Sequence, residues 1–200
     1  MKMDSMKKDK KINLLQTLKE DFSIFAFMSN MKYSPISFII LFIKNPAYRR
    51  LLDYRFKTSG VFLLKFLRPF TFLSSIHINL LILSDNNTSN IGGGLFFVHG
   101  FSTIIYCKSM GKNCRIYQQV TIGNNNGIPT IGNDVEICAG AKVIGPIHIG
   151  DDVIIGANAV VTKDIPSHSM VVGVPGKIIK TRKSKNDSWE KISETNNYPT

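Results

Sequence analysis

The sequence predicts a mainly β protein, a parallel β-helix preceded by a small α-helical region. The first observation is a six-residue period from residue 131 to 166, whose hexads read IGNDVE, ICAGAK, VIGPIH, IGDDVI, IGANAV and VTKDIP. An α-helix has 3.6 residues per turn and would spread this repeat around its surface. Hexapeptide repeats are typical of coils in which each flat face is one short strand. The second observation is a front of about 75 residues that has helical spacing and lacks the period.

The hexads predict which side chains form the core. Each opens with a branched aliphatic residue and carries a small or aliphatic residue four places later, and we expect both sets to point inward and stack from coil to coil. The openers are Ile131, Ile137, Val143, Ile149, Ile155 and Val161, and the second set is Val135, Ala141, Ile147, Val153, Ala159 and Ile165. Gly132, Gly150 and Gly156 are expected at corners, because glycine tolerates the backbone angles of a turn best. Cys114 takes an inward position and Cys138 a corner position.

Along the chain, residues 1–11 are polar and expected to be disordered. Residues 12–30 have apolar positions at helical spacing, and Asn45-Pro46 predicts the capped start of a second helix, followed by a helical piece at 61–70. The coil begins irregularly at residue 91, and a Gly/Asn loop at 123–130 is too polar for the core and must project outward. This gives an α-helical region at 1–75, a β-helix at 76–180 and a loose polar tail at 181–200.

Composition limits the classes of function. The net charge is +11, and residues 1–75 hold 14 Lys and Arg against 5 Asp and Glu. Such a front fits either a solvated helical face or contact with an anionic membrane surface or polymer. No nucleic-acid partner is expected, because no reading motif is present. Three cysteines without a pairing pattern, no expected signal peptide and no apolar run of about 20 residues predict a cytoplasmic protein, with the inner membrane face as an alternative.

Few residues could carry chemistry. His99 stands in FFVHGF, where the coil is still irregular, and a histidine is the natural base for deprotonating an alcohol. The other histidines are scattered, so they could share a metal only across a subunit boundary, and no metal is expected. No phosphate-binding loop, dinucleotide fingerprint or nucleophile elbow is present.

The hexads, HG at 99–100, QQVTIGNNNGIPTIG and the closing GVPGK together resemble hexapeptide-repeat acyltransferases, in particular the serine acetyltransferase branch with its relatives that modify polysaccharides. This resemblance covers residues 80–180 and, more loosely, NPAYRRLLDYRF in the front. It implies a left-handed β-helix, a homotrimer with a dimer of trimers left open, acetyl-CoA as cosubstrate and active sites in clefts. By the same resemblance His99 is the general base. The residues that it assigns to coenzyme A are Ala139, Ala157, Lys163, Gly173, Pro175 and Lys177.

The chain departs from that branch at its acceptor site. The aspartate that precedes the catalytic histidine is replaced by Val98, and the position of a second, histidine-orienting aspartate falls on Ser84 or Asp85. The acceptor loop lacks the Arg-His pair that grips a carboxylate and offers Asn124, Asn125 and Asn126 instead. We therefore expect O-acetylation of a saccharide hydroxyl, in a capsule, O-antigen or exopolysaccharide unit. The alternatives are serine O-acetylation for cysteine synthesis and a non-catalytic scaffold, with a γ-type carbonic anhydrase as a remote fourth.

Overall fold

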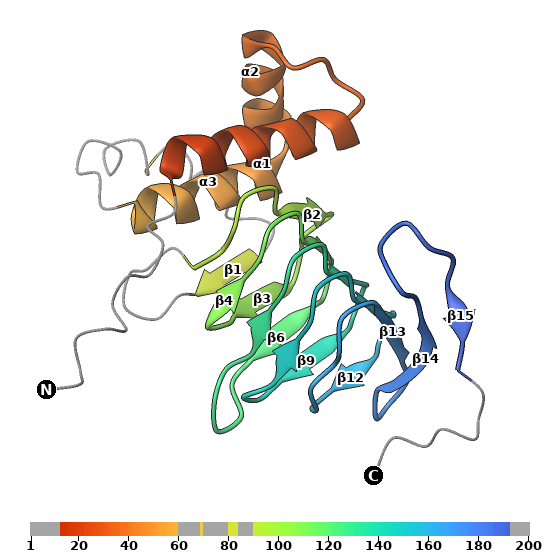
Figure 1. Cartoon of the computed structure of the whole chain (residues 1–200). Coiled ribbons are helices and arrows are strands. Elements are labelled where there is room, and N and C mark those ends of the chain that lie inside the picture. The colour runs from red at the N-terminus through yellow and green to blue at the C-terminus, as the bar shows by residue number, and fades with distance from the viewer. Residues whose placement is uncertain (1–12, 60–68, 70–79, 84–89, 193–200) are drawn as a thin grey trace, which may run out of the picture.

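A computed structural model describes residues 13–59, 69, 80–83 and 90–192 and shows a three-helix layer above a β-helix (Figure 1). The expected disorder at 1–11 and most of the expected helical piece at 61–70 lie outside the described residues. Among these residues, no helix combines the length and the apolar character that a membrane span needs.

The helices are α1 (Leu14–Met28), α2 (Pro35–Lys44) and α3 (Pro46–Thr58). Side-chain oxygens of Asn13, Ser34 and Asn45 accept hydrogen bonds from backbone N–H groups in the first turns of the three helices. Each cap satisfies a donor that a helix start otherwise leaves free. The helix predicted over 12–30 and the predicted Asn45-Pro46 start are both confirmed. α2 occupies the stretch between the two prolines.

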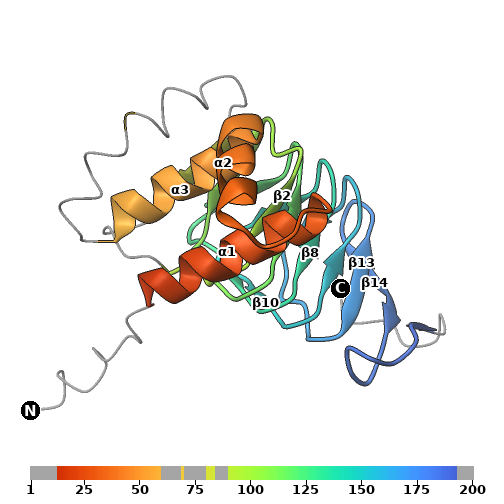
Figure 2. The same ribbon diagram turned by 90° about the horizontal axis from the view of Figure 1, so that it is seen from above.

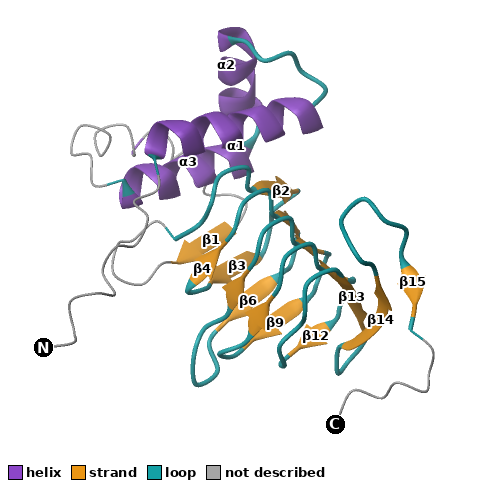
Figure 3. Ribbon diagram, in the orientation of Figure 1, coloured by secondary structure: helices purple, strands orange, loops and turns teal. Residues whose placement is uncertain are grey.

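The strands form three sheets, one on each side of the coil (Figure 3). The first contains β1 (Leu80–Leu83), β3 (Thr103–Tyr106), β6 (Thr121–Gly123), β9 (Lys142–Ile144) and β12 (Val160–Val161). The second contains β4 (Ser109–Met110), β7 (Thr130–Ile131) and β10 (His148–Ile149). The third contains β2 (Phe96–Val98), β5 (Arg115–Tyr117), β8 (Glu136–Ile137), β11 (Ile154–Ile155), β13 (Ser169–Val172), β14 (Lys177–Thr181) and β15 (Glu190–Lys191). All pairs are parallel except those of β14 with β13 and β15. The predicted mainly β solenoid is confirmed.

The core consists of side chains that stack in register from coil to coil. Ile131 pairs with Ile149, Ile137 with Ile155 and Val143 with Val161. All twelve residues predicted to face inward are 0–7% exposed. Cys114 is also buried, and burial raises the pKa of its thiol to about 12. It therefore packs as a neutral, small apolar residue.

The reason for glycine in the hexads differs from the expected one. Gly132 and Gly150 do not have positive φ. Instead, a Cβ on Gly132 would lie 2.7 Å from the backbone carbon of Gly150, and one on Gly150 would lie 2.4 Å from the backbone nitrogen of Ser167. Successive coils approach too closely here for any side chain. The positive φ of this corner falls two residues later, at Asp134 and Asp152.

A buried ion pair joins the helical layer to the first coil. Arg55 of α3 donates to both carboxylate oxygens of Asp21 of α1, at 2.9 and 3.2 Å, and both side chains are 0% exposed. Arg55 also donates to the carbonyl oxygens of Ile91 and Gly92, while Asp21 accepts from the backbone N–H groups of Gly94 and Leu95. The pair thus binds two helices and the start of the coil with nearly all of its polar groups satisfied.

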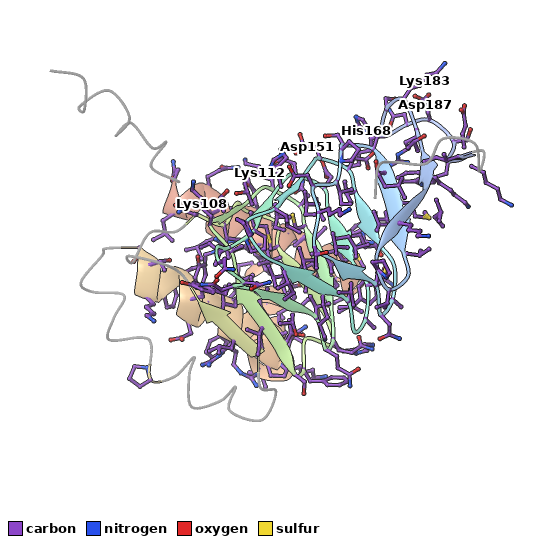
Figure 4. All side chains as sticks on the ribbon, turned by 90° about the horizontal axis from the view of Figure 1, so that it is seen from below. Lys108, Lys112, Asp151, His168, Lys183 and Asp187 are labelled. Carbon is purple, nitrogen blue, oxygen red and sulfur yellow. The ribbon has the colours of Figure 1, made fainter. Side chains whose placement is uncertain are left out.

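A second ion pair closes the other end of the coil and corrects the expectation of a loose tail. β14 and β15 form a hairpin on β13 over part of 181–200. Arg182 donates through two nitrogens to the carboxylate of Asp152, His168 lies 2.8 Å from that carboxylate, and Trp189 stacks on the guanidinium at 4.3 Å. In Figure 4, His168 lies on one edge of the coil, between Asp151 and the side chains of Lys183 and Asp187. These contacts hold the hairpin, because Asp152 belongs to the coil and Arg182 to the tail.

Asp21→Ala is expected to lower the free energy of unfolding by about 3–5 kcal/mol, because it leaves the buried Arg55 without its counter-charge. Urea unfolding measures the loss. The control is Glu20→Gln on the same helix, which removes an exposed ion pair with Lys112 and should cost less than about 1 kcal/mol. Equal losses in the two variants would contradict a structural role of the buried pair.

Gly132→Ala is expected to destabilise the coil by about 1–3 kcal/mol, since the added Cβ would overlap the backbone of the next coil. Gly123→Ala is the matched control, because its Cβ would meet only side-chain atoms at 3.6 and 3.8 Å. Thermal unfolding of both variants tests the expectation. A Gly132→Ala variant with unchanged thermal stability would show that the coils can move apart without loss of stability.

Stability is expected to fall in acid through Asp152. Burial alone would raise the pKa of Asp152, but hydrogen bonds from Arg182 and His168 hold it below its ordinary value of 3.8. A carboxyl with a lowered pKa stabilises the folded state above pH 3.8, and this contribution is lost as the pH falls through the folded-state pKa. Arg182→Gln should therefore cost about 1.5–3 kcal/mol at pH 7, and the difference from the parent chain should shrink below about pH 4. A difference that stays constant down to pH 3 would contradict this linkage.

Candidate active site

His99 lies at an enlarged corner of the first coil, directly after β2. Seven residues separate Phe97 from Ile105, whereas five separate Ile116 from Ile122, which pair with them on the next coil. The additional residues move the chain outward at His99, whose side chain is exposed. Both His99 and Gly100 have positive φ, 65° and 57°. A histidine in this region is uncommon, so the corner is held by its surroundings.

The helical layer fixes this corner from above. A Cβ on Gly100 would lie 3.3 Å from the Cβ of Ala47 on α3 and 3.2 Å from that of Phe97, and the positive φ independently favours glycine there. From the other side, the hydroxyl of Thr103 lies 3.2 Å from the carbonyl oxygens of Phe101 and Tyr117, to which it donates. His99 is therefore an exposed side chain on a backbone segment with defined packing partners.

The coil places His99, on the enlarged first corner, next to a series of residues at the equivalent corners of the following coils. Phe97, Ile116, Ile137, Ile155 and Val171 follow one another in register on neighbouring strands. The residue two places after each of these lies where the chain leaves a strand of the third sheet; after the first four strands the chain continues to the first sheet, and after β13 it turns back into β14. These residues, which we call the corner column, are His99, Gln118, Ala139, Ala157 and Gly173.

Four of the five column residues were predicted site residues. The structure therefore brings His99, Ala139, Ala157 and Gly173, which span most of the coil in sequence, onto one edge. Ala139 is half-buried, and Ala157 and Gly173 are exposed. With no side chain larger than a methyl group at these three positions, an extended molecule could lie against the backbone there.

Gln118 is the column residue that sequence reasoning missed. It occupies the same place in its hexad as Ala139 in the hexad that stacks on it in the next coil, and this equivalence could have identified it. Among the described residues, its buried side-chain oxygen has no hydrogen-bond partner. A buried oxygen without a hydrogen bond lowers the free energy of unfolding by about 1–3 kcal/mol. Its presence near His99 is therefore a local irregularity of the candidate site.

The closing turn ends the column. The N–H of Gly176 donates to the carbonyl oxygen of Val160 at 2.7 Å, and the N–H of Val160 donates to that of Gly173 at 3.0 Å. These bonds fold the turn against β12 and leave Pro175 and Lys177 exposed. The Arg182 contacts described above hold the hairpin that follows.

Other predicted residues lie away from the column. Lys163 is exposed and follows β12, so it lies where the strands of the first sheet end, whereas the corner column lies where they begin. Asn124, Asn125 and Asn126 are exposed in the loop after β6, which is also at that end. Within one chain, neither the loop nor Lys163 shares the corner of His99.

The loop has its own internal structure. Eight residues separate Ile122 from Ile131, whereas five separate Val143 from Ile149 on the next coil. Asn124 Oδ1 accepts a hydrogen bond from Gly127 N at 3.0 Å, and Asn125 N donates to Gly127 O at 3.1 Å. The predicted outward projection is confirmed, and the loop offers amide groups without charge.

No carboxylate is bonded to His99 within the part of the chain that the structure describes. Val98 precedes it and is half-buried, while Ser84 and Asp85, the predicted orienting positions, lie outside the described residues. No three His, Cys, Asp or Glu side chains converge as a metal site among the described residues either. The chemistry available at this corner is that of an exposed imidazole beside a narrow backbone edge.

Comparison with known proteins relates this geometry to a family. The family model for the bacterial transferase hexapeptide (six repeats) matches residues 128–163. A serine acetyltransferase of Synechococcus elongatus is 43% identical over 97 residues, which are 46% of this chain and 40% of that protein. One from Staphylococcus aureus is 46% identical over 98 residues, or 46% of each chain. The chain spans less than half the length of these curated relatives.

A solved structure extends the likeness beyond the repeats. The crystal structure of Neisseria gonorrhoeae serine acetyltransferase in complex with serine superposes with a TM-score of 0.61 and 25% sequence identity, covering 83% of this chain and 69% of that one. The family model, the curated relatives and this structure agree with the coil described above. The chain contains hexapeptide repeats, and its β-helix is similar to that of serine acetyltransferases.

Proposed function

We propose that this chain transfers an acetyl group from acetyl-CoA to a hydroxyl group, with His99 as the general base. The observation that carries the proposal is the corner column, in which an exposed histidine on the enlarged first corner stands beside the edge formed by Ala139, Ala157 and Gly173. A pantetheine arm needs a narrow, unobstructed edge, and these small residues provide one. Pro175 and Lys177 stand next to the far end of the column, where Lys177 offers a cation to phosphate groups.

The reaction needs only groups that the column and the cosubstrate supply. His99 accepts the proton of the acceptor hydroxyl as its oxygen attacks the thioester carbonyl carbon. Backbone N–H groups hold the resulting oxyanion. When the carbon–sulfur bond breaks, His99 returns the proton to the leaving thiolate, which gives free CoA and an acetyl ester. The thioester supplies the driving force, so neither a metal nor an acyl-enzyme is required.

The acceptor loop suggests that the active site is shared between subunits. The loop and His99 occupy opposite edges of the first sheet within one chain, so the loop of one subunit could reach a corner column only in its neighbour. A homotrimer of coils packed side by side satisfies this requirement with closed symmetry. Lys163, at the same edge as the loop, would approach coenzyme A across the same boundary.

L-serine is the first acceptor to test. The relatives and the superposed structure are serine acetyltransferases, and the latter contains serine. This favours serine over the saccharide expected from the sequence. The saccharide remains the second candidate for one reason, the uncharged loop at 124–126, because a carboxylate is best held by a charged donor. If serine is the substrate, groups outside this loop bind its carboxylate.

His99→Ala is expected to lower kcat by about 10²–10⁴-fold, because the hydroxyl loses its base. Thiol release from acetyl-CoA measures the rate. His148→Ala is the matched control, since His148 is an exposed histidine of the second sheet and its loss should leave the rate unchanged. An active His99→Ala would remove His99 as the base, and a chain that neither binds CoA nor turns over would favour a scaffold.

The same assay separates the acceptors. Thiol release with L-serine, and not with a panel of monosaccharides and oligosaccharides, would establish serine O-acetylation. Thiol release with a sugar and not with L-serine would establish the saccharide candidate. The short uncharged loop would then explain the choice of acceptor.

A further inference from the structure

The helical layer presents a row of large apolar side chains to solvent at the end of the molecule opposite the closing hairpin. Tyr33, just before α2, is 61% exposed, and Ile36, Ile39 and Ile43 of α2 are 69%, 56% and 68% exposed. The three isoleucines have the spacing i, i+3 and i+7, which places them on one face of α2. We call Tyr33 and these three isoleucines the apolar tip. Figure 1 shows α2 extending away from the coil, and in the view from above in Figure 2 it lies beside α1 and α3.

The outward orientation of this face is fixed by contacts on the other side of α2. Leu41 is 3% exposed and packs in the core of the layer. At the C-terminus of α2, Arg49 donates through Nη1 to the carbonyl oxygens of Phe42 and Ile43, both at 2.6 Å. At its start, Ser37 donates to the carbonyl oxygen of Lys32 at 2.5 Å. Because both ends of α2 are bonded, the exposure of its isoleucines is a property of the packed fold.

The charge around the tip has one sign. Between residues 22 and 52 the sequence contains four cations and no Asp or Glu, although Arg49 is buried and Arg50 lies 3.9 Å from the carboxylate of Asp53. Lys32 and Lys44 flank the two ends of α2, and both are exposed. An isologous contact with a second copy would place this patch against itself and bring lysines near lysines without a carboxylate to separate them. An anionic surface is the complementary partner.

We propose that the apolar tip docks on the surface of an anionic lipid bilayer. α2 has 10 residues, whereas a spanning helix needs about 20, so it would lie in the interface with its isoleucines among the acyl chains and its lysines at the headgroups. Tyr33 suits the same depth, because aromatic rings with a polar end collect at the membrane–water boundary. In the proposed trimer, cyclic symmetry would direct three tips to one side, and their binding would reinforce one another.

Flotation of the purified full chain with vesicles tests this docking. The vesicles are phosphatidylcholine alone or phosphatidylcholine mixed with an equal part of phosphatidylglycerol. The parent chain should float with the mixed vesicles and, at moderate salt, much less with the neutral ones. Failure to bind the mixed vesicles would overturn the proposal.

Matched variants assign the contact to the tip. Ile36→Ser should weaken binding to the mixed vesicles by about tenfold, whereas Leu15→Ser, which changes a 63% exposed residue of α1 outside the tip, should not. Lys32→Gln with Lys44→Gln should abolish the preference for anionic vesicles. Equal binding by Ile36→Ser and the parent chain would overturn the assignment to the tip.

Two further measurements separate this proposal from the others. Light scattering over a dilution series reports self-association, and a particle that becomes smaller in Ile36→Ser would mean that a second copy covers the tip. Thiol release by Ile36→Ser should equal that of the parent chain with a water-soluble acceptor, because Ile36 is exposed at the start of α2, whereas the corner of His99 packs against Ala47 of α3. Loss of vesicle binding with retained thiol release separates docking from catalysis.

Discussion

The close approach of successive coils is the constraint on which the β-helix depends. At Gly132 and Gly150 the backbones are so near that not even a methyl group fits. Each coil must therefore repeat the path of the one before it, and side chains at equivalent positions must stack. The stacked aliphatic core follows from this constraint, and so does the corner column, since a fixed path brings residues from distant hexads onto one edge.

The candidate functional features occur where the path is longer than the repeat requires. The corner at His99 and the loop at 123–130 each contain more residues than the segment that pairs with them. A regular hexad buries two of its side chains and keeps the others close to a flat face. An enlarged corner can instead present a histidine, and a long loop can present amides. The regular coils then serve as a rigid support for the irregular ones.

The sequence predicted those parts of the structure that depend on local pattern. Hexad openers such as Ile137 and Val143 were assigned to the core correctly, because the six-residue period requires stacking. The start of α3 was also correct, since Asn45 and Pro46 form a local cap. The position of His99 on the coil followed from the motif around it. By contrast, the role of Gly132 was misjudged, because the space between coils is not visible in a single hexad.

Interactions between distant residues could not be predicted in this way. Asp21 and Arg55 lie on separate helices, and the residues that flank each of them in the sequence do not indicate a buried ion pair. Arg182 stands in a polar segment that reads as a loose tail, yet Asp152 holds it in place. Gln118 could not be singled out either, because it stands beside a second glutamine in the sequence. Only the strand register shows that it lies at the corner of the coil that follows His99. The preference for a saccharide rested mainly on one short loop, whereas the likeness to serine acetyltransferases rests on about half of the chain.

The Asp21–Arg55 pair also restricts how this sequence can diverge. Replacement of either partner alone leaves the other charge buried without a counter-charge. Replacement of both by well-packed apolar residues can leave the stability unchanged or even raise it. Single-step evolutionary routes away from the pair therefore pass through an intermediate that folds poorly. Descendants of this sequence should keep both residues or lose both, so that the two helices and the first coil change together over evolutionary time.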